Sequence, residues 1–238
     1  MTPPAERDDV RYTIGKVLLL LCATVVALHL AAVAVRSLAR PDGAPADVLA
    51  LLNGGHERSL ASWWTSALLI ACALTAVVAG RLAETRKAGR AWVVLAAVFA
   101  LLSLDEIVSL HERGAEWAAA VFESGSLLAR LGWTIPAAAV LVLSLVVLVP
   151  AFRVIPARPR TVILAGLATS IAGALGMEVL NVLLADAGAR YLWRHLVMTL
   201  EEAAEMVGVV IVLLGVLTAL RVRWADGRLT LTYDATGR

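Results

Sequence analysis

Acidic residues stand inside apolar stretches of this 238-residue sequence. Three glutamates fall within the run Thr199-Leu-Glu-Glu-Ala-Ala-Glu205, and the run Ser103-Leu-Asp-Glu-Ile-Val-Ser-Leu-His-Glu112 ends an earlier apolar stretch. An ionised side chain near the centre of a bilayer costs on the order of 2.5–3.5 kcal/mol. These acids must therefore be neutralised by basic residues, by bound protons or by bound cations, and the nearest arginines are few.

Carboxylates and histidines together suit a metal ion. Iron, manganese and zinc accept such ligands, and helical bundles hold dinuclear sites between Glu and His side chains of facing helices. We expect a divalent metal ion, with iron or manganese favoured over zinc. The predicted ligands are Asp105, His111, Glu112, Glu178, His195, Glu201, Glu202 and Glu205. The residues predicted to support the ligands, or to begin a helix, are Ser103, Glu106, Asn181 and Thr199.

Helical spacing predicts which of these side chains share a face. Asp105 and Glu112 are seven residues apart, so they stack on one stripe of a helix, and His195 and Glu202 do the same. Glu202 and Glu205 are the strongest candidates, because they lie roughly 12–16 Å beyond Arg194 along a helix that rises about 1.5 Å per residue. Serine or threonine three residues before a glutamate also fits a capping box, which would instead begin a helix at residues 103 and 199.

The elements that position these residues are six apolar stretches, each near the roughly 20 residues that a helix needs to cross a bilayer. They cover residues 15–36, 62–80, 91–112, 132–151, 161–185 and 194–220. The sequence is 60% hydrophobic and 17% charged, which is typical of a membrane protein. Because the alternation of barrel strands is absent, we predict an all-α integral membrane protein with a six-helix domain at 15–222 and tails at 1–14 and 223–238.

Basic residues predict the orientation of the helices. With the N-terminus inside, fourteen Lys and Arg residues lie on the cytoplasmic side and seven outside, so both termini are predicted to be cytoplasmic. Trp63 and Trp64 are expected at the outer interface and Trp92 at the inner one. The acids then fall in one layer in the outer half of the membrane. His29, in the first stretch, is expected to be a core histidine at a depth from which it could join this layer.

Two classes of function remain open for a multi-pass protein of the cell membrane. The first is a metal-dependent oxidoreductase or hydrolase that acts on a lipid, a quinol or another apolar substrate. Redox work would need an electron-donor partner, because no dinucleotide-binding glycine motif is present. The second is a proton- or cation-coupled transporter or channel. The shared form of residues 103–106 and 199–202 favours a 3+3 inverted repeat, which is typical of transporters.

Other classes have less support from the sequence. A third reading is a subunit that only stores or senses metal. Cys22 and Cys72 lie in apolar runs, which predicts no disulfide framework and no cysteine-based metal site. The formal net charge of +2 gives no argument for nucleic-acid binding, and nothing in the sequence indicates an oligomeric state.

Overall fold

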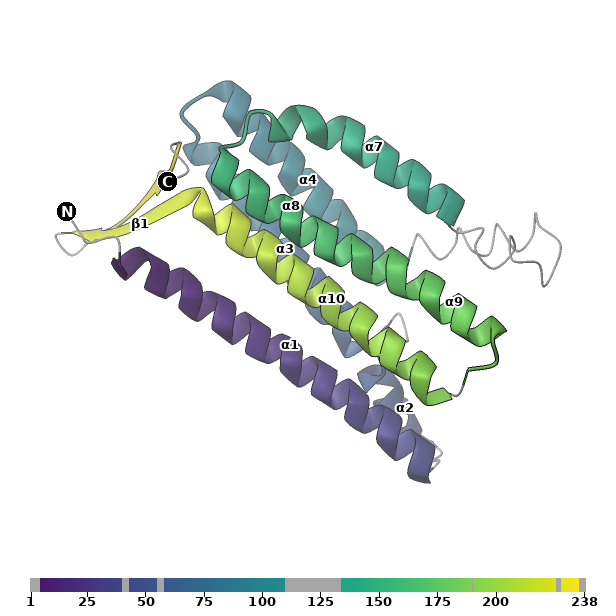
Figure 1. The fold of residues 1–238 in the computed structure, drawn as a ribbon. Helices are drawn as coiled ribbons and strands as arrows, with labels where there is room; N and C mark the ends of the chain where they lie inside the picture. The colour runs from purple at the N-terminus through teal and green to yellow at the C-terminus, as the bar shows by residue number, and fades with distance from the viewer. Residues whose placement is uncertain are drawn as a thin grey trace.

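A computed structural model describes residues 5–39, 43–54, 58–109, 134–189, 191–225 and 228–235. The described chain forms a bundle of long helices with a β-hairpin at one end (Figure 1). Successive long segments run in alternating directions along the bundle, and a short α2 (Ala44–Leu52) joins the first to the second. The long segments are α1 (Ala5–Ala39), α3 (Leu60–Leu82), α4 (Arg86–Val108), α7 (Thr134–Phe152), the continuous α8 (Ala157–Ile171), η1 (Ala172–Met177) and α9 (Glu178–Asp186), and α10 (Tyr191–Thr218).

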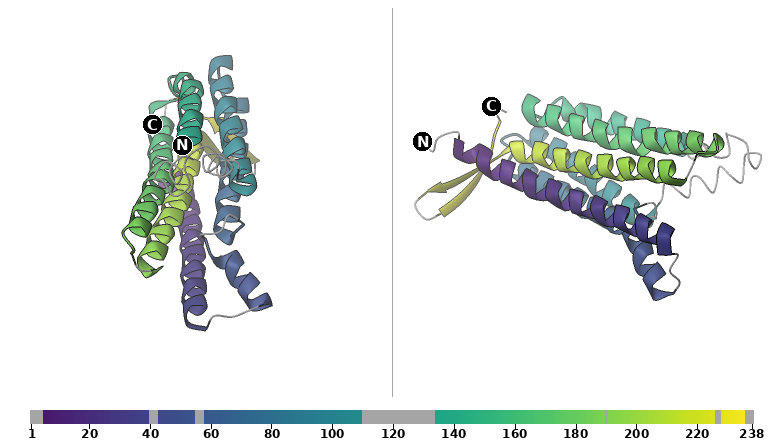
Figure 2. Two further views of the ribbon diagram at one scale, coloured as in Figure 1. Left: turned by 90° about the vertical axis from the view of Figure 1, so that its right-hand side faces the viewer. Right: turned by 60° about the horizontal axis from the view of Figure 1, so that its bottom comes forward.

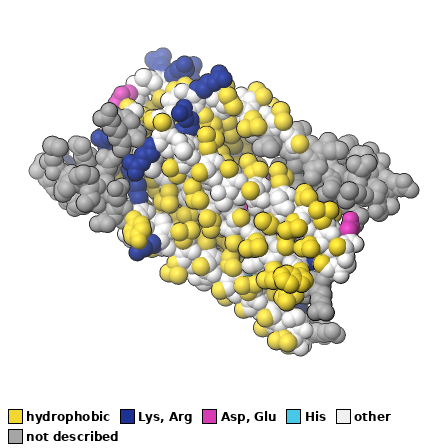
Figure 3. All heavy atoms as spheres, in the orientation of Figure 1, with side chains coloured by type: hydrophobic (Ala, Val, Ile, Leu, Met, Phe, Trp, Pro, Cys, Tyr) yellow, Lys and Arg dark blue, Asp and Glu magenta, His cyan; other side chains and the backbone are white. Residues whose placement is uncertain are grey.

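The fold is that of a predominantly α-helical membrane protein. Four segments of the described chain are long and apolar enough to cross a membrane, namely Val10–Ala39, Leu60–Leu82, Arg86–Val108 and Ala157–Asp186. Of the remaining two predicted stretches, one forms α7, with a shorter apolar part at Val142–Phe152, and the other forms the acid-bearing α10. Hydrophobic side chains cover the length of the bundle in Figure 3, as expected for a surface that faces lipid.

Helix caps explain where two of the helices begin. The Ser59 side chain accepts a hydrogen bond from the Ser62 amide at the start of α3, and Thr85 does the same for Ala88 at the start of α4. These side chains satisfy amides that have no partner within the helix. Ser103 and Thr199 lie inside α4 and α10, so the prediction that they begin helices is wrong.

The end of α4 differs from the prediction in a way that affects the candidate ligands. The helix stops at Val108, and Ser109 takes the left-handed conformation with φ 55°, while its amide donates to the Asp105 carbonyl over 2.7 Å. The uninterrupted α4 helix therefore ends before the residues that the sequence predicted at its outer end. His111 and Glu112 themselves lie outside the described residues.

Two pairs of helices pack most closely, α3 with α4 and α8 with α10. Glycines allow both contacts, because a Cβ built on Gly89 would lie 2.9 Å from the Gly80 carbonyl oxygen, and one on Gly166 would lie 2.6 Å from the Val212 amide. Close backbone approach between small residues is a common way to join helices in lipid. Helix α10 also packs against α1, α3 and η1, so it runs through the centre of the fold (Figure 2).

Ser66 of α3 and Ser103 of α4 form a reciprocal hydrogen-bonded pair. The two hydroxyl oxygens lie 2.7 Å apart, and each hydroxyl also reaches the other residue's carbonyl over 3.1 Å. We expect Ser66→Ala and Ser103→Ala each to lower the free energy of unfolding by about 0.6–1.7 kcal/mol. The double variant should lose less than the sum, because both changes remove the same contacts. Unfolding titrations in detergent would measure this, with Thr24→Ala, an exposed hydroxyl bonded within its own helix, as the control.

A β-hairpin follows α10, where the sequence predicted only a tail. Strands β1 (Leu220–Ala225) and β2 (Arg228–Tyr233) pair antiparallel, and the Asp234 amide donates to the Ala219 carbonyl. Arg221 pairs with Asp234 over 2.6 Å, which raises the pKa of Arg221. Trp92, near the start of α4, is fully buried and donates its indole N–H to the Tyr233 hydroxyl over 3.1 Å, so its side chain joins the hairpin to the core of the bundle.

We predict that ionisation of Tyr233 lowers the stability of the protein at alkaline pH. Burial raises the pKa of Tyr233 above its ordinary value of about 10. A tyrosine whose pKa is raised on folding adds stability that is complete below the unfolded pKa and is lost as pH rises through the folded one. In an ultraviolet titration, the difference between the wild type and Tyr233→Phe should therefore show a phenol that ionises above pH 10. Ionisation at or below the ordinary value would contradict this.

Candidate functional site

Acids from two helices converge at the end of the bundle away from the hairpin. Glu202 lies on α10, and the charges of Glu205, Glu106 and Glu201 are near enough to act on it. Glu106 comes from α4, ninety-six residues earlier in the chain, so the two acidic runs predicted to meet are close in space. Asp105, Glu106, Glu201 and Glu205 are all partly exposed.

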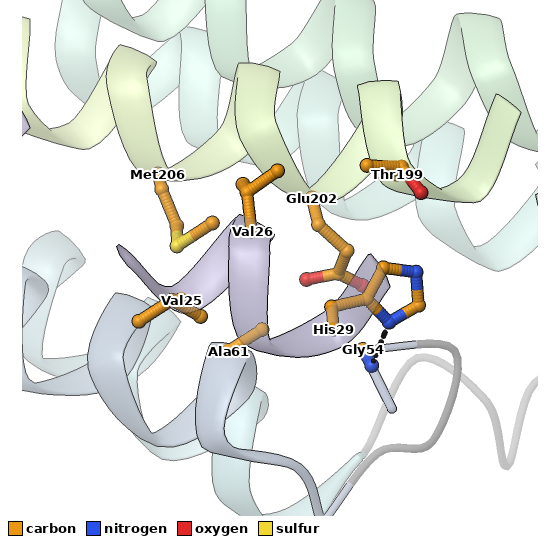
Figure 4. A pocket seen from close by; sticks show the side chains of 8 residues that line it. All are labelled: Val25, Val26, His29, Gly54, Ala61, Thr199, Glu202 and Met206. Atoms are coloured by element: carbon orange, nitrogen blue, oxygen red, sulfur yellow. Dashed lines mark hydrogen bonds between the residues drawn. The ribbon is translucent and has the colours of Figure 1, made fainter. Parts of the chain in front are cut away.

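The Glu202 side chain faces a narrow recess between α1, α10 and the connection that follows α2 (Figure 4). The other side chains around it are Val25, Val26, His29, Ala61, Thr199 and Met206, with Gly54 as the backbone wall. A Cβ built on Gly54 would lie 3.0 Å from Glu202 Cγ, so this glycine lets the chain run directly against the glutamate. The recess leaves no room for a water molecule.

His29 joins this recess from α1. Its side chain is only 2% exposed, and its Nδ1 accepts a hydrogen bond of 2.8 Å from the Gly54 amide. Because Nδ1 is an acceptor, the neutral ring carries its proton on Nε2. Nε2 is buried and has no hydrogen-bond partner among the residues that the structure describes. The sequence placed His29 at the right depth but gave no signal for its contact with Gly54.

The Glu202 carboxylate is poorly satisfied. Within the described ranges it forms no hydrogen bond and no ion pair, and its electrostatic neighbours are other acids. Glu202 is only partly buried, as the neighbouring acids are, but an ionised carboxylate inside an apolar helical bundle is costly unless it is paired, hydrogen-bonded or neutralised. Its lack of a hydrogen-bond or ion-pair partner within the described ranges therefore sets Glu202 apart from the other predicted site residues.

The remaining predicted residues have more ordinary surroundings. Thr199 donates to the His195 carbonyl one turn earlier in α10, and Ser103 is bonded to Ser66. Asn181 accepts a hydrogen bond of 3.2 Å from Arg194 Nε. Glu178 begins α9, but its side chain is outside the described part of the structure. His195 is partly buried and lies within electrostatic range of His29.

The described residues do not by themselves make a metal centre. In the described ranges, no group of three or more His, Cys, Asp or Glu side chains is arranged to hold a metal ion. His29 does not fit as a ligand either, because Nδ1 is engaged by Gly54 and Nε2 carries the proton, which leaves no free lone pair. A metal site would need side chains from outside the described set, such as His111, Glu112 or Glu178.

A π-helical turn packs against the backbone of the acids from the other side. Between α8 and α9 the backbone forms the π-helix η1, and π-helical turns are frequent at functional sites. A Cβ built on Gly173 in η1 would lie 3.2 Å from the Glu201 carbonyl oxygen, and the Ser170 hydroxyl donates to the Glu205 carbonyl over 3.1 Å. The irregular segment is therefore in contact with the backbone that carries the acids.

Comparison with known proteins gives one match. A family model described as a domain of unknown function, DUF8692, matches residues 17–220. No curated protein and no solved structure matches the chain.

Proposed function

The chain belongs to the DUF8692 family, a domain of unknown function, and we propose that it is a proton-coupled transporter of the cell membrane in which Glu202 carries the proton. The observation behind this proposal is the setting of Glu202. It faces a recess too narrow for water, has no hydrogen bond or ion pair within the described ranges, and lies near three other carboxylates. Such a group must be neutralised, and a proton is the smallest cation that fits.

The π-helical turn η1 within the continuous segment α8–η1–α9 also favours transport. π-helical turns inside α-helices are frequent at functional sites. Here the turn lies beside Glu201 and Glu205, at the level of the acids rather than elsewhere in the bundle. A π-helical turn offers a place where a helix can change its shape while the rest of it stays packed.

We further propose six membrane spans with both termini in the cytoplasm. Exposed Lys and Arg side chains gather at the end of the bundle that carries the hairpin and the start of α1 (Figure 3). They include Arg81, Arg86, Lys87, Arg90, Arg153 and Arg158. Positive charge marks the cytoplasmic side of a membrane protein, so the acidic end faces outward.

Packing supports a repeat of helix pairs, although not the motif that suggested it. The α3–α4 pair packs closely, as the α8–α10 pair does, and α1 packs on α10 as α7 packs on α4. However, Ser103 lies near the end of α4 and Thr199 near the start of α10, so both are at the same end of the bundle. An axis in the membrane plane would carry one end to the other, and the two motifs are therefore not equivalent.

Reconstitution in liposomes tests the proposal. With an imposed pH gradient and candidate cations on the opposite side, the wild type should dissipate the gradient and Glu202→Gln should not, because glutamine has the same shape but binds no proton. Glu84→Gln, which changes an exposed carboxylate in the α3–α4 connection, is the control. Equal gradient loss in wild type and Glu202→Gln would refute the role of Glu202.

A metal-dependent enzyme acting on a lipid, quinol or other apolar substrate is the second candidate. One observation favours it: Glu106 and the α10 acids are close together, and His111 and Glu112 follow directly after α4 in sequence. As an oxidoreductase it would need an electron-donor partner. Elemental analysis of protein purified without chelator separates the candidates, since two equivalents of iron or manganese would support the enzyme and a metal-free protein with proton flux would support the transporter.

A further inference from the structure

The exposed face of α4 is basic where the helix begins and apolar further along. It consists of residues three or four positions apart, all of them exposed, namely Arg86, Arg90, Val93, Ala97 and Leu101. This spacing places side chains on one stripe of a helix. The apolar part continues for about 16 Å beyond Arg90, at a rise of about 1.5 Å per residue. That length is close to half of the roughly 30 Å hydrocarbon core of a bilayer.

Helix α7 has the same arrangement in the opposite direction. Val142, Val146, Val149 and Arg153 are exposed at the same spacing, and the cation comes last. The Arg153 amide donates to the Val149 carbonyl over 3.2 Å, so Arg153 continues the last turn of the helix. Because α7 packs against α4 and runs antiparallel to it, Arg153 lies at the same end of the bundle as the start of α4 (Figure 1).

The two groups of cations are held on one packed core. Arg160 donates from Nη1 to the Phe152 carbonyl over 3.3 Å, which closes the turn that carries Arg153. Phe152 is buried in the same hydrophobic cluster as Trp92, which follows Arg90 by two residues in α4. The arginines at the end of α7 and at the start of α4 are therefore positioned by the core rather than by independent loops.

The protein itself does not neutralise these cations. Among the described residues, no hydrogen bond or ion pair engages the side chains of Arg86, Arg90 and Arg153. Glu84 is the only acid in the sequence from 81 to 90, and there is none from 142 to 160. Lys and Arg side chains gather at this end beside a hydrophobic surface in Figure 3. An anion from outside the chain is therefore the expected partner.

We propose that this end of α4 and α7 binds an anionic phospholipid, with its phosphate on Arg86, Arg90 and Arg153 and its acyl chains along the two apolar stripes. The proposal goes beyond the transport function and does not depend on Glu202. A guanidinium group can hold a phosphate through two hydrogen bonds at once, and basic clusters beside membrane helices attract anionic lipids. The apolar stripes select a lipid over a soluble anion, because a free phosphate leaves them without a partner. The arginines select an anionic lipid over a zwitterionic one, whose head group carries a cation of its own.

Native mass spectrometry of the protein in detergent tests the proposal. The probe is dioleoylphosphatidylglycerol. Dioleoylphosphatidylcholine has the same chains without a net charge, and glycerol 3-phosphate has the phosphate without the chains. We expect the wild type to bind phosphatidylglycerol at least about tenfold more tightly than phosphatidylcholine, and glycerol 3-phosphate not to displace it. Affinity for phosphatidylglycerol should fall about fivefold for each arginine removed, in Arg153→Gln and in the double variant Arg86→Gln/Arg90→Gln.

The double variant Arg36→Gln/Arg58→Gln is the matched control, because it removes two exposed arginines at the opposite end of the bundle. It should bind phosphatidylglycerol as the wild type does. An equal loss of affinity in this control, or equal binding of the two lipids, would overturn the proposal. Displacement by glycerol 3-phosphate would also overturn it, since the site would then bind a soluble anion. Thermal unfolding checks that each variant is folded, and if Arg86→Gln/Arg90→Gln is not, Arg153→Gln decides the result.

Discussion

A Gly208→Ala variant is expected to push α8 away from α10 and to lower the free energy of unfolding by about 1–3 kcal/mol or more. A Cβ built on Gly208 would lie 2.6 Å from the Ser170 amide and 2.7 Å from the Gly166 carbonyl oxygen, and closer still to the Ser170 hydroxyl. Backbone atoms cannot rotate away as a side chain can. The two helices must therefore separate, and the many contacts between them weaken together.

The separation should also reach the candidate site. Ser170 donates to the Glu205 carbonyl, and η1 touches the backbone of Glu201, so a shift of α8 changes the position of the acids. We expect Gly208→Ala to lose gradient dissipation as well as stability. Gly176→Ala is the matched control, because a Cβ there meets no atom within 4 Å. A Gly208→Ala protein with wild-type unfolding would show that this contact is looser than described.

A Glu202→Met variant is expected to gain stability while losing transport. Methionine fills a similar volume without a charge, and it removes a carboxylate whose electrostatic neighbours among the described residues are other acids. Functional residues are often kept at a cost in stability, and replacing them commonly adds about 0.5–2 kcal/mol. Unfolding titrations in detergent should show a higher free energy of unfolding, and flux measurements in liposomes on the same preparation should show that transport is lost.

The comparison with an exposed acid makes this prediction specific. Glu84→Met in the α3–α4 connection should alter the free energy of unfolding by no more than about 0.5 kcal/mol. If Glu202→Met instead destabilises the protein, the carboxylate contributes a favourable interaction, and a bound cation would be the first explanation to examine by elemental analysis.

The helices themselves could be predicted from local sequence. A run of about 20 apolar residues in lipid has to satisfy each backbone group internally, so it forms a helix whatever its neighbours are. Each of the six predicted stretches lies mainly within a long helical segment, with ends that differ by at most about five residues except at the start of α1, which begins ten residues earlier than predicted. Ser109 is the exception that matters, because nothing in the hydropathy of residues 103–112 marked the left-handed turn that ends α4.

The surroundings of the candidate site depended on contacts between distant residues. Glu202 stood out in the sequence because it lies deep in an apolar segment, and Glu106 and Glu202 are indeed near each other. His29 reaches the recess through a hydrogen bond to an amide twenty-five residues away, which no periodicity reveals. The Trp92–Tyr233 hydrogen bond joins residues 141 positions apart. It holds a β-hairpin against the bundle where the sequence predicted only a tail.

The sequence alone thus determined that the protein is helical, that it is apolar enough for a membrane, and that carboxylates stand where lipid would not tolerate them unneutralised. Only the tertiary structure decided which carboxylate faces a narrow recess, which histidine lies beside it, and where a π-helical turn lies next to the acids. The physical reason is that the backbone hydrogen bonds of a helix in lipid join residues one turn apart, so they depend on local sequence. The surroundings of a side chain depend instead on the other helices that pack around it.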